Sequence, residues 1–241
     1  MSALIHITRA GNPDGTPLVF FHGYGFDHGI WLSLLPELEA RADIYFVDLP
    51  GHGLSAELPW DIFKEELKRA LPSKPCIFIG WSLGGLYAIR WATEEPQTVS
   101  RLVTIAALPR FTIAEEWAAI DPQVFHDFRS KLLEDKSKVI TDFVRIQGSN
   151  LTYAPRTFPS LTILEEGLDA LTTWDFRADM HRLTIPVHCM FGRLDRITPI
   201  QTMALMQEHY PHFEYLLFHK AGHIPFLSHT QDFLEKLLSW L

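Results

Sequence analysis

Short apolar runs alternate with longer amphipathic segments along most of this chain. Runs of apolar, β-branched or aromatic residues predict buried strands at residues 18–21, 44–47, 76–79, 102–105, 187–191 and 215–218. Helical spacing lies between them, at residues 30–38, 62–71, 86–92, 203–209 and 233–240. Strands that alternate with helices indicate βαβ units. The sequence therefore predicts an α/β fold with a mostly parallel central sheet flanked by helices.

The strand signals stop between residues 109 and 180. Apolar residues recur there at helical spacing, first as Phe125, Phe128, Leu132 and Leu133 and then as Val139, Ile140, Phe143 and Val144. Pro155 and Pro159 interrupt the pattern, which resumes over residues 161–171. We therefore expect a single domain in which residues 1–108 and 181–241 form the α/β core, and residues 109–180 form a helical lid inserted over the sheet.

Composition narrows the class of protein. The chain has 241 residues, of which 47% are hydrophobic, enough for one sizeable core. Its net charge of -8 argues against nucleic acid as a partner, because phosphate binding needs a basic face. Neither a signal peptide nor a membrane-spanning stretch is evident, so we expect a cytoplasmic protein without membrane contact. Cys76 and Cys189 lie in apolar runs and are expected to be buried, reduced thiols.

A Gly-x-Ser-x-Gly motif occupies residues 80–84, between an expected strand and an expected helix. A serine on such a turn projects its hydroxyl from the edge of the sheet, and the flanking glycines avoid collisions between side chains. A glycine-rich helix start can also occur without chemistry, but the setting and the downstream partners favour the chemical interpretation. The sequence therefore predicts Ser82 as a nucleophile.

Two later residues complete the chain order nucleophile, acid, base. His223 follows the last expected strand and is predicted to act as general base, because serine is a weak nucleophile until a base takes its proton. Asp195 follows the strand at residues 187–191 and is predicted to orient the imidazole. The rival position for an acid, residues 105–108, holds no carboxylate. Asp48 also ends a strand but precedes the serine, so we expect it to hold a turn.

Backbone amides are expected to stabilise the oxyanion that forms when an ester carbonyl is attacked. The N–H of Leu83 lies at the start of the helix that follows the motif, where the helix dipole favours negative charge. The second donor is expected to be the N–H of Tyr24, in the glycine-rich loop after the first clear strand. A simple turn is the alternative interpretation of that loop.

With these residues assembled, the chain resembles the α/β-hydrolase superfamily over nearly its whole length. A closer similarity, to the BioH-type carboxylesterases of biotin synthesis, is carried by the sequences VDLPG at residues 47–51, GWSLGGL at 80–86, GRLD at 192–195 and AGHIPF at 221–226. That family cleaves the methyl ester of pimeloyl-acyl-carrier protein and releases methanol. The resemblance implies a serine carboxylesterase that works through an acyl-enzyme, with no metal and no organic cofactor.

The same resemblance assigns roles inside the lid. It implies that the substrate is bound by Tyr24, Ser82, Leu83, Phe143, Val144, Arg145, Ile146, Gln147 and His223. It also implies that basic lid residues bind the acidic acyl carrier protein, and the candidates are Arg129, Lys131, Lys136, Lys138, Arg145 and Arg156. Two positions depart from the family pattern, because Asp142 stands where a basic residue is expected and Tyr24 where the family has Trp. Ordinary lid packing and a solvated helix face are the alternatives for individual residues.

The function expected from these residues is hydrolysis of an acyl ester, either a small molecule or one linked to the carrier protein, by a monomer. The same triad would also serve a general short-chain carboxylesterase, a C–C bond hydrolase, a lactonase or a perhydrolase with another lid pocket. A ligand receptor built on a hydrolase scaffold is the non-enzymatic alternative. Multiple turnover without a partner protein distinguishes an enzyme from a receptor.

Overall fold

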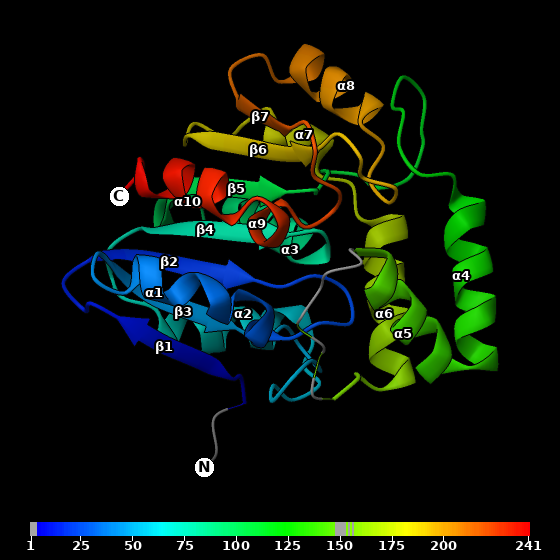
Figure 1. Cartoon of the computed structure of the whole chain (residues 1–241), viewed down its shortest axis with the longest axis horizontal. Helices are drawn as coiled ribbons and strands as arrows, with labels where there is room; N and C mark the ends of the chain where they lie inside the picture. The colour runs from blue at the N-terminus through cyan, green and yellow to red at the C-terminus, as the bar shows by residue number, and fades with distance from the viewer. Residues whose placement is uncertain (1–3, 148–152, 154, 156) are drawn as a thin grey trace.

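The computed structural model describes residues 4–147, 153, 155 and 157–241 (Figure 1). Its sheet has the strand order β1-β3-β2-β4-β5-β6-β7, formed by β1 Ile7–Gly11, β2 Thr16–Phe21, β3 Ala42–Val47, β4 Cys76–Trp81, β5 Val99–Ile105, β6 Val187–Gly192 and β7 Glu214–Phe218. The helices are η1 His28–Leu34, α1 Leu35–Leu38, α2 Trp60–Ala70, α3 Leu83–Glu94, η2 Pro96–Thr98, α4 Pro122–Glu134, α5 Lys136–Gln147, α6 Leu161–Thr173, α7 Arg177–Met180, α8 Gln201–His209, α9 Pro225–Ser228 and α10 Thr230–Leu238. Over these described ranges, no helix is long and apolar enough to cross a membrane.

The sheet is parallel except at one edge. Strands β2 to β7 pair in parallel, as the alternation of strands and helices predicts, whereas β1 pairs antiparallel to β3, with Ile7 opposite Val47. The pattern of hydrophobic residues did not predict β1. Its residues are only half buried or exposed, because it forms an edge strand, so it lacks the continuous apolar run of the central strands.

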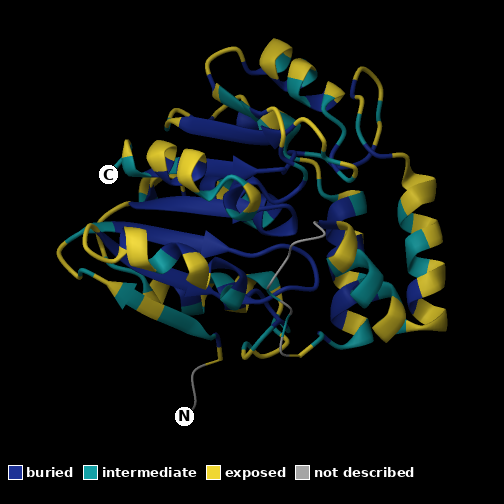
Figure 2. Cartoon of the chain, viewed as in Figure 1, coloured by how far each residue is buried: buried dark blue, intermediate teal, exposed yellow. Residues whose placement is uncertain are grey.

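Both faces of the sheet are covered, which is why the central strands are apolar at successive positions. In β2, Leu18 and Phe20 pack on the face that carries η1, α1 and α10, whereas Val19 and Phe21 pack on the face that carries α2 and α3. Figure 2 shows the strands as a buried layer between helices whose outer surfaces are exposed. Cys76 and Cys189 lie in this layer as free buried thiols, as predicted, and burial raises the pKa of each to about 12.

The segment predicted as a helix over residues 30–38 is mostly a 3-10 helix. Asp27 caps its start by accepting a hydrogen bond from the N–H of Gly29, and the N–H of Leu35 bonds back to Leu32 rather than one residue further. Pro36 has no N–H, so the bond that would continue an α-helix through this point cannot form. The regular helix α1 is therefore reduced to four residues.

Helices α4, α5 and α6 lie together beyond the edge at which the parallel strands end (Figure 1). Each follows the apolar spacing found in the sequence, with Leu132 and Ile140 buried on the inner side. Leu133, which belongs to the same apolar run, is 56% exposed instead. The carboxyl ends of β2, β4, β6 and β7 thus face these helices, and the loops that leave those strands carry the predicted chemistry.

Candidate active site

Ser82 occupies the turn between β4 and α3 in a backbone conformation that residues with a side chain rarely adopt. Its φ is 54° and its ψ is -119°, outside the regions that strands and helices use. The surroundings fix this conformation, because the N–H of Ser82 donates to the carbonyl of Ile105 at 2.9 Å and its carbonyl accepts from the N–H of Gly85 at 2.9 Å. The side chain therefore leaves the sheet edge at a sharp turn, as the motif predicts.

The two glycines of the motif are required by close backbone contacts. A Cβ on Gly80 would lie 2.4 Å from the carbonyl oxygen of Gly84, and a Cβ on Gly84 would lie 2.3 Å from that of His22. Real Cβ atoms essentially never approach so closely, so any larger residue would push α3 away from the sheet. The steric reason inferred from the motif is thus confirmed for both glycines.

Asp195 and His223 meet at the ends of β6 and β7. The Nδ1 atom of His223 lies 2.7 Å from Oδ2 of Asp195, and each side chain is only 2% exposed. The other carboxylate oxygen, Oδ1, accepts hydrogen bonds from the N–H groups of Ile197 at 2.7 Å and Thr198 at 3.0 Å. The carboxylate is therefore held on both oxygens, and its geometry orients the imidazole. Within the described part of the chain, the Nε2 atom of His223 is buried and has no hydrogen-bond partner.

The loops that carry the acid and the histidine bind directly to each other. The N–H of Leu194 donates to the carbonyl of Ala221 at 2.9 Å, and a Cβ on Gly192 would lie only 1.9 Å from the carbonyl oxygen of Gly222. Only a residue without a side chain fits at this crossing. The chain therefore needs glycine as the last residue of β6, a requirement that the hydrophobic pattern did not reveal.

Two further residues position the site and were missed in the sequence. Trp81, next to Ser82, donates its Nε1–H to the carbonyl of His223 at 2.8 Å, and the two rings lie 5.6 Å apart. Thr198 donates its hydroxyl to the carbonyl of Ala106 at 3.1 Å, which ties the acid loop to the end of β5. Trp81 lies inside the recognised motif and Thr198 follows the acid by three residues, but neither position is specified by the chemistry alone.

The two amides predicted as oxyanion donors belong to different elements, α3 and the loop after β2. Leu83 is the first residue of α3, so its N–H has no acceptor within the helix. Tyr24 follows β2 in the neighbouring loop, and its hydroxyl donates to the carbonyl of Leu164 in α6 at 2.9 Å. Burial raises the pKa of the Tyr24 phenol well above its usual range, so the group stays a neutral donor. Helix α6 thus holds this side chain in place.

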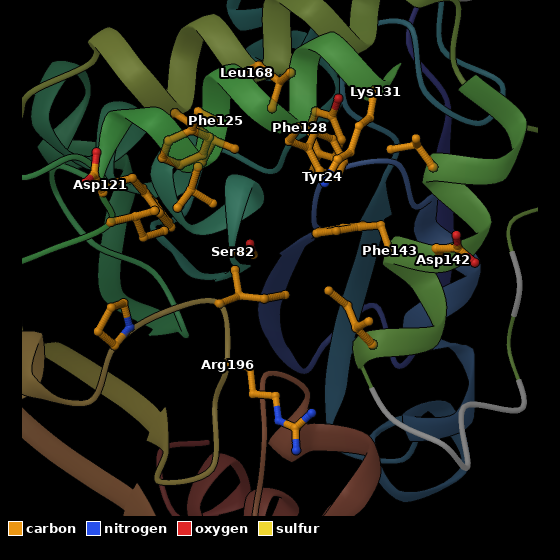
Figure 3. Close-up of a pocket in the computed structure, with 18 of the residues that line it drawn as sticks. Tyr24, Ser82, Asp121, Phe125, Phe128, Lys131, Asp142, Phe143, Leu168 and Arg196 are labelled. Atoms are coloured by element: carbon orange, nitrogen blue, oxygen red, sulfur yellow. The ribbon is translucent and has the colours of Figure 1, made fainter. Parts of the chain in front are cut away.

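A cavity of about 730 Å³ lies between the serine turn and the lid helices (Figure 3). Its wall is mainly apolar and includes Phe125 and Phe128 of α4, Phe143 of α5 and Leu168 of α6. Charged residues lie along its rim, namely Asp121, Lys131, Glu134, Asp135, Lys138, Asp142 and Arg196. The size and the lining suit a chain-like apolar ligand.

The predicted substrate-binding residues occupy different environments. Tyr24, Ser82, Phe143 and Ile146 line the cavity, whereas the lining does not include Leu83, Val144, Arg145, Gln147 or His223 among the described residues. Gln147 is 3% exposed, and its amide donates to the carbonyl of Phe143 within α5. Arg145 is exposed and lies 3.5 Å from Asp142. The sequence match therefore covers residues that face the cavity and residues that face away from it.

A polar network supports the loop after β2 but stays outside the cavity. Asp48 accepts from the N–H of His28 at 2.7 Å and from the N–H of Leu54 at 3.0 Å, which confirms its expected role in holding a turn. Burial alone would raise its pKa, but these bonds and the His28 ring lower the value to about 2. Asp48 forms a cluster with His6 and His28 whose potential metal-ligand atoms lie within 4.8 Å of one another. None of these three residues is among the described residues that line the cavity.

Comparison with known proteins agrees with this geometry. The profile of the alpha/beta hydrolase family matches residues 18–236. Among solved structures, an esterase from Exiguobacterium antarcticum superposes with a TM-score of 0.87 at 21% identity and covers 98% of this chain and 94% of its own. The enol-lactonase from Burkholderia xenovorans LB400 has the same fold, with a TM-score of 0.74 at 16% identity, and covers 98% of this chain and 95% of its own. The chain belongs to the α/β hydrolase family.

Two curated relatives narrow the class. The pimeloyl-[acyl-carrier protein] methyl ester esterase of Legionella pneumophila is 44% identical over 235 residues, with 97% of both chains covered. The protein of that name from Aeromonas hydrophila is 35% identical over 250 residues, with 96% of both chains covered. Within the α/β hydrolases, the chain is thus a member of this family of carboxylic ester hydrolases, as its resemblance in the sequence implied.

Proposed function

We propose that this chain hydrolyses the methyl ester of pimeloyl-acyl-carrier protein in biotin synthesis, with Ser82, His223 and Asp195 as its catalytic triad. The observation that carries the triad is the 2.7 Å contact between His223 Nδ1 and Asp195 Oδ2, two side chains that are each only 2% exposed. The identity of the substrate is supported by the full-length similarity to esterases that carry its name.

The reaction follows from the order of these groups. The hydroxyl of Ser82 attacks the ester carbonyl while His223 Nε2 accepts its proton, and the imidazolium that forms is stabilised by the carboxylate of Asp195. The proton then passes to the alkoxy oxygen, methanol leaves, and the acyl group remains on the serine. Water attacks this acyl-enzyme with the same histidine as base. No step calls for a metal or an organic cofactor.

The N–H groups of Leu83 and Tyr24 are proposed to bind the oxyanion of each tetrahedral intermediate. Leu83 supports this role because it begins α3, where the helix dipole favours negative charge. Tyr24 supports it because its side chain is fixed under the lid, which holds its loop in place. Preorganised donors of this kind lower the activation barrier without reorganising during the reaction.

The proposal also includes binding of the acyl carrier protein. Several of the predicted basic residues are already paired within the lid, so only some are available for this contact. Arg129 pairs with Asp169, and Lys138 and Arg145 lie within 3.2 and 3.5 Å of Asp142. The acidic residue found in place of an expected basic one thus partners two of the candidates.

Two candidates remain in the described part of the lid, while Arg156 lies outside the described residues. Lys136 donates to the carbonyl of Pro159, and Lys131 is exposed at the cavity rim. We therefore assign the main carrier contact to Lys131 and expect the others to contribute less.

Charge reversal tests the carrier contact. Lys131→Glu is expected to lower kcat/KM for carrier-linked pimeloyl methyl ester on the order of ten-fold, because a rim charge acts mainly on encounter with a charged partner. Hydrolysis of free methyl heptanoate should stay unchanged. Lys236→Glu, an exposed change on α10, is the control and should affect neither substrate. Equal losses on both substrates would contradict a carrier contact.

The pathway role has a genetic test. Expression of the chain in a biotin auxotroph that lacks its own pimeloyl methyl esterase is expected to restore growth, and the Ser82→Ala variant is expected not to. A soluble chain that hydrolyses simple esters but fails to restore growth would contradict the pathway role and leave a general carboxylesterase.

A further inference from the structure

The cavity extends along the whole length of α4 rather than ending at the serine. The residues that line it from this helix and its cap recur every three or four positions, singly or as adjacent pairs. They form a single stripe consisting of Asp121, Val124, Phe125, Phe128, Lys131, Glu134 and Asp135. At 1.5 Å per residue this stripe spans about 20 Å. In Figure 3, Ser82 lies between the Asp121 end and the Lys131 end of the stripe. The cavity therefore has two arms that meet at the nucleophile.

The two arms differ in character. The amino-terminal arm, which we define by Phe111, Ala119, Ile120 and Val124, is apolar, and its floor is closed because Phe111 and Ile120 are 1% and 8% exposed. The N–H of Ile120 bonds to the carbonyl of Phe111, which fixes this floor. Asp121 is the charged residue at its rim.

The turn-side arm, which we define by Lys131, Lys138, Val139 and Phe143, leads to the turn between α4 and α5. It mixes apolar residues with charged ones of both signs, because Glu134, Asp135 and Asp142 line the cavity beside the two lysines, whereas the residues that define the amino-terminal arm are all apolar. An acyl chain whose far end is attached to a carrier protein has to leave the cavity. The arm with the charged, exposed residues suits that exit, because buried Phe111 and Ile120 close the other arm. The leaving alcohol then occupies the opposite arm.

A methyl group leaves most of that arm unfilled. A methylene group occupies about the volume of a water molecule, roughly 30 Å³, so a seven-carbon acyl chain fills on the order of 200 Å³. That is less than a third of the cavity of about 730 Å³. An apolar alcohol of several carbons would bury its chain against the amino-terminal arm and gain binding energy from it.

We propose that the amino-terminal arm is a binding site for the alcohol part of the ester, and that the enzyme also hydrolyses esters of apolar alcohols of about six carbons. Water is the co-reactant, the ester C–O bond breaks, and the acid and the free alcohol are the products. This inference rests on the proposed function, because the same Ser82 has to form the acyl-enzyme.

A pair of isomeric esters tests the assignment of the arms. Methyl heptanoate has a long acyl chain and a small alcohol, and hexyl acetate has the reverse, so the two have the same composition. The wild type is expected to hydrolyse both. Ala119→Phe fills the amino-terminal arm and is expected to lower kcat/KM for hexyl acetate at least about ten-fold, while methyl heptanoate stays within about two-fold.

Two further variants separate the arm from a general effect. Ala118→Phe changes an exposed neighbour that does not line the cavity, so both rates should stay at the wild-type level. Val124→Phe fills the same arm from a side chain that is 57% exposed, so it serves if Ala119→Phe does not fold. It should give the same selective loss of hexyl acetate hydrolysis.

Each outcome bears on one proposal. No detectable hydrolysis of hexyl acetate by the wild type, or an unchanged rate in both arm variants, would overturn the alcohol site while leaving methyl ester hydrolysis intact. A selective loss on methyl heptanoate would reverse the arms and overturn the inference as well. Wild-type rates on both esters in Ser82→Ala would instead overturn the proposed function.

Discussion

The catalytic site at the carboxyl ends of the strands, called the sheet edge below, and the lid cavity beside it are built on opposite principles. At the sheet edge, Asp195 and His223 are almost fully buried and hydrogen-bonded, and glycines allow backbone atoms to cross in contact. In the lid, Val124 and Ile146 line the cavity while remaining 57% and 59% exposed. The catalytic geometry is therefore fixed by close packing, whereas substrate choice depends on a cavity wall whose side chains are partly exposed and can be exchanged. Changes at the sheet edge should therefore be severe, and changes in the lid should be graded.

Among changes that leave the nucleophile in place, the largest effect is expected for Asp195→Asn. The amide cannot hold the His223 tautomer that the carboxylate selects, so kcat should fall on the order of 10⁴-fold with the fold retained. Steady-state kinetics on methyl heptanoate measures the loss, and circular dichroism checks the fold. Asp179→Asn, at a half-buried acid on α7 that pairs with Arg182 and does not line the cavity, is the control. A loss below about ten-fold would show that the buried acid is not needed to orient the base.

Packing at the sheet edge can be tested by comparing the stability of two glycine-to-alanine variants. A Cβ at Gly84 would lie 2.3 Å from the His22 carbonyl oxygen, so Gly84→Ala should lower the free energy of unfolding by about 3 kcal/mol. At Gly222 the nearest atom would lie at 3.8 Å, and Gly222→Ala should cost less than about 1 kcal/mol. Urea unfolding measures both. Equal costs would mean that the tight crossing at α3 is not a special constraint.

Acid stability tests the buried pair His22 and His52, whose rings lie 5.2 Å apart. Burial lowers the pKa of His52 to about 3, so the folded state keeps the ring neutral while the unfolded chain takes up a proton near pH 6.5. Stability should therefore fall as the pH drops below about 6.5, and this residue accounts for about 2 kcal/mol by pH 5. His52→Asn should remove that part of the difference between unfolding at pH 7 and pH 5.

His22, which lies beside His52, also contributes to this pH dependence and defines how much of it should remain in the variant. Burial also lowers the pKa of His22, which is present in both proteins and gives a slope of the same sign. The variant should thus keep a weaker pH dependence rather than none. An identical pH dependence in the two proteins would contradict a neutral buried His52.

The smallest effect is expected in the lid. Phe143 packs edge-on against Tyr24 and Phe128 and forms part of the cavity wall. Phe143→Ala should raise KM for methyl heptanoate about ten-fold with little change in kcat, because it removes apolar contact with the acyl chain. Leu133→Ala, on the exposed side of α4, should leave both parameters unchanged. A large fall in kcat instead would place Phe143 with the sheet edge rather than with the cavity.

The same contrast explains what the sequence could predict. Buried parallel strands require apolar residues at successive positions, and the nucleophile turn requires glycines at fixed spacing, so the strands and Ser82 could be located from pattern alone. Edge strand β1 does not need apolar residues at successive positions, because its residues are only half buried or exposed. Asp195 and His223 could be predicted by chain order, but their contact depends on loops that cross at Gly192.

The lid was predictable only as helices. A stripe of apolar residues on α4 looks the same in sequence whether it packs against a neighbour or lines a cavity. No feature of the sequence therefore indicated that Val124 and Ala119 line the cavity. The match of residues 143–147 to an acyl path did not separate Ile146, which faces the cavity, from Arg145, which pairs with Asp142 at the surface. Tertiary packing decides these roles.

Trapping the acyl-enzyme tests most directly whether Ser82 is the nucleophile. The wild type, mixed with an excess of a p-nitrophenyl ester and quenched early, should release one equivalent of nitrophenolate in a burst and carry the acyl mass on the peptide that contains Ser82. Ser82→Ala should retain its fold, show neither burst nor adduct, and lose turnover on the order of 10⁴-fold or more. An adduct on another residue, or ester cleavage by Ser82→Ala at the wild-type rate, would contradict the assignment of Ser82 as the nucleophile.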